Sequence, residues 1–192
     1  MIQRVPCKTC GDSIHPDTAA QNDGLCMPCK GGYRQRIEDG KKRREQERQY
    51  DQSPERRYWV GLVKRVHGEG AGFEGLAPSE KTYYATTCLM GEVYNGGFHQ
   101  FFSNSSGSLY GYALDGLMAM DAENAVGLLL RAKERVFGDR TVPLYRQARN
   151  DLMADFEIDD VELNGLDKLF WQDPDKLGER CEQFARLHGL YS

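Results

Sequence analysis

The sequence predicts a mainly α-helical protein in three parts: a four-cysteine module over residues 1–32, a charged helical linker over residues 33–57, and an all-helical domain over residues 58–192. Three observations carry this prediction. Four of the six cysteines lie in the first 29 residues, the stretch that follows has almost no apolar residues, and apolar residues recur at helical spacing from Tyr58 onward. Alternating strand patterns are rare throughout.

Composition excludes two classes of protein. The chain of 192 residues is 40% hydrophobic and 28% charged, and its mean hydropathy is -0.66. No apolar run approaches the roughly 18 residues that a membrane helix needs. The first thirty residues hold no apolar core of a signal peptide. We therefore expect a cytoplasmic protein, neither secreted nor membrane-spanning.

The first 32 residues contain the pattern C-x₂-C-x₁₅-C-x₂-C. Each C-x-x-C turn presents two thiolates on one side of a tight knuckle, and two knuckles complete a tetrahedral sulfur site that suits one structural Zn²⁺. Disulfides and a redox-active C-x-x-C are the alternatives, and a reducing compartment disfavours disulfides. The second knuckle leads directly into a basic helix, as in zinc-ribbon and treble-clef modules, which this segment resembles. The predicted ligands are Cys7, Cys10, Cys26 and Cys29.

The linker is predicted to be a solvated helix from about residue 27 to about residue 50, frayed at Gly40. Residues 34–57 hold nine Lys+Arg and six Asp+Glu, and Glu38–Lys42 has the spacing of a helical ion pair. A solvated linker is one interpretation. Weak nucleic-acid contact through the basic side chains is the other.

The helical domain is predicted to begin with an amphipathic helix from Tyr58 and a glycine-rich loop over 67–75. The G-x-G-x-x-G pattern at 70–75 follows a helix instead of a strand, so we interpret it as a flexible loop and not a dinucleotide site. The next helix, from Ser79 to about Tyr94, is apolar on nearly all sides and is expected to be central and buried. An aromatic turn over 98–102 and a loop over 104–108 are expected to follow.

Helix signals continue to the end of the chain. We predict helices over 109–120, over 122–137 with Asp121 as N-cap, over 143–156, over 161–171, and from Pro174 to His188 with Asp173 as N-cap. Together these make about seven helices in this domain.

The most distinctive segment runs from Glu92 to Gly107. Two glycines in succession permit positive φ and a tight reversal, and a partly buried Glu92 is expected to accept backbone N–H groups there. One interpretation is a carboxylate that fastens a turn. The other is a Glu92–His99 acid–base pair, which lacks an accompanying nucleophile, metal cluster or oxyanion device. The motif residues are Glu92, Asn95, Gly96, Gly97, Phe98 and Asn104.

This run, E-V-Y-N-G-G-F-H-Q-F-F-S-N-S-S-G, resembles the signature of the DMP-type DNA-mimic family, a widespread bacterial family. Its usual pattern is an acidic residue, N-G-G-F, an aromatic-rich turn and N-S-x-G. The resemblance covers roughly residues 58–190 and implies an all-helical fold. It also implies a function: one member imitates the phosphate backbone of DNA with surface carboxylates and occupies a DNA-binding regulator.

Charge is distributed unevenly along the chain. Residues 1–57 carry 12 Lys+Arg and 9 Asp+Glu, whereas residues 58–192 carry 13 and 20. An imitation of DNA requires a dense acidic surface, because a duplex has one charge per about 1.7 Å of its axis. The predicted partner-binding residues are Asp151, Asp155, Glu157, Asp159, Asp160 and Glu162.

The leading hypothesis is a non-enzymatic binding protein whose acidic helical domain engages a basic DNA-binding protein or a nuclease toxin. The alternative is a direct nucleic-acid binder that uses the cysteine module and the basic helix. An enzyme built on Glu92 and His99 is the third.

Overall fold

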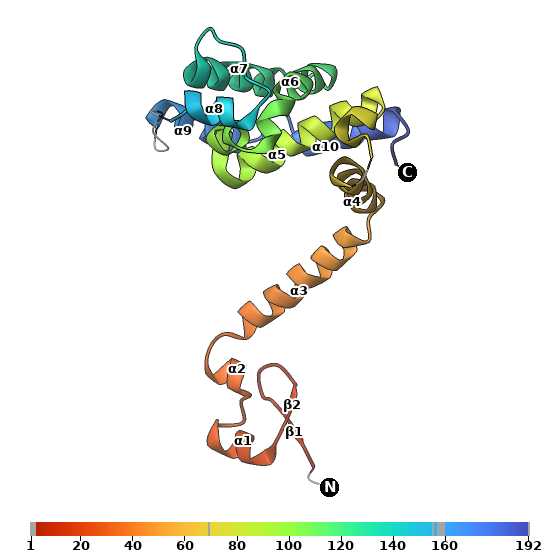
Figure 1. The fold of residues 1–192 in the computed structure, drawn as a ribbon. Coiled ribbons are helices and arrows are strands. Elements are labelled where there is room, and N and C mark those ends of the chain that lie inside the picture. The colour runs from red at the N-terminus through yellow and green to blue at the C-terminus, as the bar shows by residue number, and fades with distance from the viewer. Residues whose placement is uncertain (1–2, 69, 155, 157–159, 192) are drawn as a thin grey trace. The chain divides into compact units, whose positions relative to one another are not determined.

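The computed structural model describes residues 3–191 except 69, 155 and 157–159. The chain divides into two compact units, residues 1–56 and residues 57–192. The predicted mainly α-helical fold is confirmed, since the described residues form one two-stranded sheet and are otherwise helical or irregular (Figure 1).

The first unit is a small cysteine-containing module followed by a helix. Its strands pair antiparallel, with Val5 opposite Ile14. Its core is small, consisting of Cys7, Ile14 and Cys26 with partly buried neighbours. The elements are β1 (Val5–Pro6), β2 (Ser13–Ile14), α1 (Pro16–Gln21), α2 (Met27–Lys30) and α3 (Arg34–Asp51).

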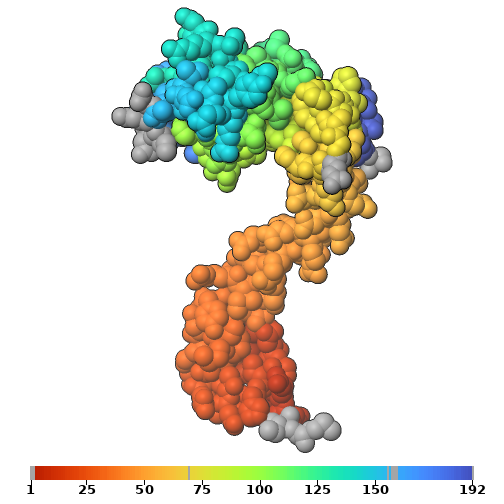
Figure 2. Space-filling view, in the orientation of Figure 1, coloured from red at the N-terminus to blue at the C-terminus, as the bar shows by residue number. Residues whose placement is uncertain are grey.

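The predicted single helix over residues 27–50 is wrong in one respect. Gly31 and Gly32 separate α2 from α3, and Gly32 adopts a φ of 70°, which ends a helix at little steric cost for glycine. From Arg34 the helix continues without interruption through Gly40 to Asp51. No residue of α3 is buried, and α3 lies within the orange part of the space-filling view (Figure 2).

The second unit is a bundle of helices. In the described part of the chain none of them combines the length and apolar character required to cross a membrane. The elements are α4 (Pro54–His67), η1 (Gly72–Gly75), α5 (Pro78–Ser103), η2 (Ser105–Leu109), α6 (Tyr110–Ala119), α7 (Glu123–Phe137), α8 (Arg146–Leu152), α9 (Val161–Trp171) and α10 (Leu177–Leu187).

The long helix α5 is central, as its apolar sequence predicts. It packs against η2, α6, α8, α9 and α10. Leu89, Val93, Phe98 and Phe101 are completely inaccessible to solvent. The aromatic residues expected to form a turn after the glycines are in fact helical, and they supply the last part of α5 (Figure 1).

Four predictions about helix N-termini are wrong. The first helix of this domain, α4, begins at Pro54 and not at Tyr58. Helix α7 starts within one residue of the prediction, but its N-cap differs. Asp121 adopts a φ of 53° and does not cap α7; the carboxylate of Asp175 accepts the Ala125 amide N–H instead, at 2.7 Å. The segment after Pro143 stays non-helical until Arg146. The last helix begins at Leu177, and Asp173 nevertheless accepts the Leu177 amide N–H.

Candidate metal centre and the Asn-Gly-Gly-Phe turn

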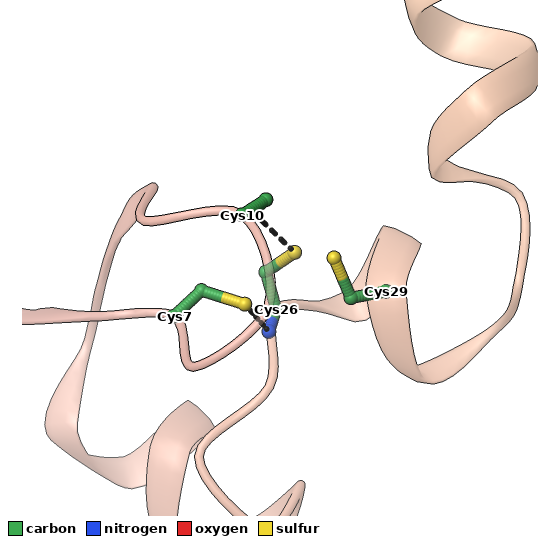
Figure 3. Close-up of side chains that lie close together, drawn as sticks. All are labelled: Cys7, Cys10, Cys26 and Cys29. Carbon is green, nitrogen blue, oxygen red and sulfur yellow. Dashed lines mark hydrogen bonds between the residues drawn. The ribbon is translucent and has the colours of Figure 1, made fainter.

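The four N-terminal cysteines form one cluster. Cys7 and Cys10 lie between β1 and β2, while Cys26 and Cys29 lie at the start of α2 and within it. Their sulfur atoms all lie within 4.8 Å of one another, and the side chains converge from both knuckles (Figure 3). The sequence spacing predicted this convergence.

Backbone hydrogen bonds hold the two knuckles in place. The Gly11 amide donates to the Cys7 carbonyl at 2.9 Å, and the Lys8 amide donates to the Gly24 carbonyl at 3.0 Å. The Cys26 amide donates to Cys7 Sγ at 3.2 Å. Backbone N–H groups of Cys10 and Cys26 lower the pKa of the Cys7 thiol to about 6. These amides favour the thiolate, which is the form that binds metal.

The cluster fits a tetrahedral metal ion. Metal–sulfur bonds of about 2.3 Å place the sulfur atoms of a tetrahedral site about 3.8 Å apart, and Cys10 Sγ lies 3.6 Å from Cys26 Sγ. All four cysteines are free in the structure. The donor set is complete with four sulfurs, so the site is closed, as in structural metal sites.

The Asn-Gly-Gly-Phe motif interrupts α5. Gly96 has φ -156° and ψ 24°, whereas Gly97 has φ 77° and ψ -178°. The Gly97 conformation belongs to a region that is essentially restricted to glycine. The break therefore lies where the two glycines predict it, and Gly97 is the residue that requires the absence of a side chain.

Two side chains of α9 hold this break. The buried Asp167 accepts the Phe98 amide N–H at 2.8 Å, and the Trp171 indole N–H donates to the Val93 carbonyl at 2.7 Å. Both backbone groups flank the non-helical residues Gly96 and Gly97, so these side chains supply hydrogen-bond partners where the helix is interrupted. Burial raises the pKa of Asp167, partly offset by the Phe98 hydrogen bond.

Within the described ranges, Glu92 accepts hydrogen bonds from side chains and not from the backbone N–H groups that we expected. Gln100 Nε2 and Asn104 Nδ2 donate to Oε2 at 2.6 and 2.9 Å, and Ser106 Oγ donates to Oε1 at 2.6 Å. Its carboxylate thereby ties the first part of α5 to the last part of α5 and to η2. His99 is not among these donors, and its ring stacks on Phe156 with centroids 6.5 Å apart.

Sequence reasoning missed Arg149, a completely buried residue of α8. Its guanidinium donates to four carbonyl oxygens, those of Phe102, Pro143, Leu144 and Asn104, at 2.6 to 2.8 Å. Phe102 lies in the last turn of α5, where helix carbonyls lack partners and carry partial negative charge. Arg149 therefore joins α8 to the C-terminal end of α5.

The predicted partner-binding acids occupy different environments. Asp151 is exposed. Asp160 caps α9 by accepting the Leu163 amide N–H at 2.8 Å, and its side chain, 13% exposed, forms an ion pair with Arg135. Glu162 pairs with the same arginine at 3.3 Å. The remaining three predictions fall outside the described residues: Asp155, Glu157 and Asp159.

One comparison identifies the family. A model of the DMP19-like protein family matches residues 74–188, which include the Asn-Gly-Gly-Phe turn and every helix from α5 to α10. Comparisons with curated proteins and with solved structures gave no match. Since the matched region covers more than half of the chain, this protein belongs to the DMP19-like protein family.

Proposed function

We propose that this chain is a non-enzymatic cytoplasmic binding protein whose acidic helical domain engages a basic, nucleic-acid-binding protein, either a DNA-binding regulator or a nuclease toxin. The observation that supports this proposal is the excess of acidic over basic residues in the helical domain. Residues 58–192 hold 20 Asp+Glu against 13 Lys+Arg, and residues 150–167 hold acids but no Lys or Arg. A surface of one sign attracts a partner of the other.

Some acidic side chains of this domain already have partners within the fold and are therefore less suited to contact another protein. Asp167 and Asp175 are buried and accept backbone N–H groups, and Asp160 caps α9. Their negative charge serves the fold. Asp151 has a neutral hydrogen-bond partner, Gln147, and we assign the contact with the partner to Asp151 and the acidic segment that follows it.

Matched charge variants test this assignment. One variant replaces Asp151, Asp155, Glu157 and Asp159 by Asn or Gln. Its control removes the same number of negative charges from exposed residues of α7 and its flanks, which have no ion pair in the described part of the chain: Asp121, Glu123, Glu134 and Asp139.

Capture of partners from the native host, identified by mass spectrometry, provides the readout. We expect the wild type and the control to retain one basic partner that the first variant loses. Retention should weaken as salt rises, because charges on surfaces are screened beyond about 8–10 Å at physiological salt. Equal retention by the first variant, or equal loss by both variants, would contradict the assignment.

We also propose that the metal of the four-cysteine cluster is one structural Zn²⁺. Four thiolates in tetrahedral geometry favour zinc, and the core of this module is too small to fold without support. The ligands would be Cys7, Cys10, Cys26 and Cys29, and the ion would supply folding free energy and no chemical step.

A second candidate function is nucleic-acid binding by α3. Lys42 and Arg44 are exposed and have no ion pair among the described residues, while Lys41 pairs with Glu38 at 3.1 Å. Replacing Lys41, Lys42, Arg43 and Arg44 by Ala in the full chain, followed by a DNA gel-shift assay, tests this candidate. A wild-type shift that the variant loses would favour it over the leading proposal.

A further inference from the structure

The second unit contains a cavity of about 370 Å³ between α4, η1, α5 and η2. This volume lies within the range of about 300–1,000 Å³ that is typical of ligand sites. We call it the Glu92 pocket. The residues that define it here are Trp59, Val63, Phe73, Tyr84, Glu92 and Ser108.

Three aromatic rings form one part of its wall. Trp59 stacks on Tyr84, with ring centroids 5.3 Å apart and an angle of 24° between the ring planes. The ring centroids of Phe73 and Tyr84 are 5.9 Å apart. Aromatic faces attract cations through the ring quadrupole, and clusters of such rings recognise alkylammonium groups. The wall therefore favours a positively charged ligand with an apolar stem.

The carboxylate of Glu92 lines the same pocket. Its hydrogen-bond partners are all neutral, and no Lys or Arg forms an ion pair with it in the described part of the chain. Among the residues that the structure describes, no lysine or arginine lines the pocket, and the one basic side chain there, His67, hydrogen-bonds the Tyr84 hydroxyl at 3.1 Å. The Glu92 charge is thus uncompensated within the pocket.

The number of free lone pairs on the Glu92 carboxylate distinguishes between an ammonium group and a guanidinium group as the ligand. A carboxylate accepts about four hydrogen bonds. Oε2 of Glu92 already accepts two and Oε1 accepts one, which leaves one acceptor position on Oε1. A bidentate guanidinium needs two free positions. An ammonium group needs one, and it can donate its other hydrogens to hydroxyl oxygens such as those of Ser105 and Ser108, which also line the pocket.

We propose that the Glu92 pocket binds a primary ammonium group on an alkyl stem, presented as a lysine side chain of the partner protein. The stem would contact Val63, Val66 and Leu109, as long basic side chains commonly lie along apolar surface. The source of the lysine rests on the proposed function, whereas the chemistry of the pocket does not.

The test uses the full chain and a small probe, Nα-acetyl-lysine N-methylamide. The chain has two tryptophans, and only Trp59 lines the pocket, while the Trp171 indole N–H is hydrogen-bonded to Val93. In ¹H–¹⁵N spectra we expect the Trp59 indole signal to shift saturably and the Trp171 signal to stay unchanged. Absence of a saturable shift would overturn the proposal.

Two comparison probes define the specificity. The norleucine analogue has the same stem without the charge, and the arginine analogue has the larger guanidinium. We expect the lysine probe to bind most tightly. Equal binding by the norleucine analogue would show a merely apolar pocket, and tighter binding by the arginine analogue would refute the lone-pair argument.

The key variant is Glu92→Gln. Its carbonyl oxygen can accept from Gln100 and Asn104, and its amide can donate to the Ser106 hydroxyl, so the hydrogen bonds persist while the charge is lost. We expect affinity for the lysine probe to fall by about tenfold or more, as for a lost charge-assisted hydrogen bond. Glu134→Gln, on the exposed face of α7, should bind like the wild type.

A pocket-filling variant keeps the test decisive if Glu92→Gln fails to fold. Val63→Phe adds bulk from α4 without changing the Glu92 hydrogen bonds, and it should abolish the Trp59 shift. Undiminished binding in either folded variant overturns the proposal. Because the probe needs no partner protein, a negative result here leaves the partner-capture experiment to decide the proposed function separately.

Discussion

Alanine at Gly97 is expected to destabilise the helical unit strongly. The backbone there has φ 77° and ψ -178°, and forcing a non-glycine residue into such a region costs about 1–3 kcal/mol. A Cβ atom at Gly97 would lie 2.2 Å from Asp167 Oδ2. Asp167 would have to move, and it would leave the buried Phe98 N–H without its acceptor, at a further cost of about 1–3 kcal/mol.

The two effects together predict a loss of roughly 2–6 kcal/mol, a large part of the roughly 5–15 kcal/mol that stabilises an ordinary domain. Urea denaturation followed by tryptophan fluorescence measures this loss. Both tryptophans lie in residues 57–192, so the fluorescence reports on that unit and not on the cysteine module.

Two alanine variants serve as internal comparisons. At Gly96 φ is negative, and a Cβ would meet the end of the flexible Gln100 side chain, so Gly96→Ala should cost less than Gly97→Ala. At Gly91, earlier in α5, a Cβ meets nothing within 4 Å, and alanine should stabilise by about 0.4–1 kcal/mol. A Gly97→Ala loss no larger than that of Gly96→Ala would refute the reasoning.

Further predictions concern the buried ionic groups and the metal. Arg149→Ala should destabilise by at least about 1–3 kcal/mol, because it leaves buried carbonyls unpaired. Arg149→Lys should recover only part of this loss, because an ammonium cannot span four acceptors. Urea denaturation tests both variants. Asp167→Asn should become more stable relative to the wild type as pH rises from about 3 to 7 in thermal denaturation. Elemental analysis should find near one zinc per chain, lost in Cys26→Ser and kept in Cys88→Ser; one zinc in both variants would contradict the assignment of ligands.

Local signals predicted the features that depend on neighbouring residues. The C-x-x-C knuckles form where their spacing indicates. Helix α9 spans Val161–Trp171 as predicted, because Asp160 caps it and Leu163, Leu166 and Phe170 recur on one buried face. In such cases the residues that cause the structure lie within a few positions of it.

Features that depend on distant residues were not predictable in this way. Asp175 caps α7 although it lies 50 positions away from Ala125 in the sequence. Nothing in the residues around Asp121 indicates that this nearer aspartate does not cap the helix. Arg149 lies in a polar segment and has the sequence context of a solvated arginine. For Asp167 a signal was present: it is four residues after Leu163 and three before Phe170, which places it on the buried face of α9. We made no prediction for this residue, because the charge count treats all acids alike.

Asp167 shows how an acid that serves the fold differs from one that serves a partner. Burial raises its folded pKa above the ordinary value of 3.8. A carboxyl group with a raised folded pKa contributes most stability below its unfolded pKa and loses that contribution as pH rises through the folded pKa. The wild type should therefore lose stability relative to Asp167→Asn above about pH 4. Asp160 has a lowered pKa, caused first by the Leu163 amide, so the wild type should gain stability relative to Asp160→Asn as pH rises through the same range. Thermal denaturation of Asp167→Asn and Asp160→Asn across pH distinguishes these internal acids from those left to attract a basic partner.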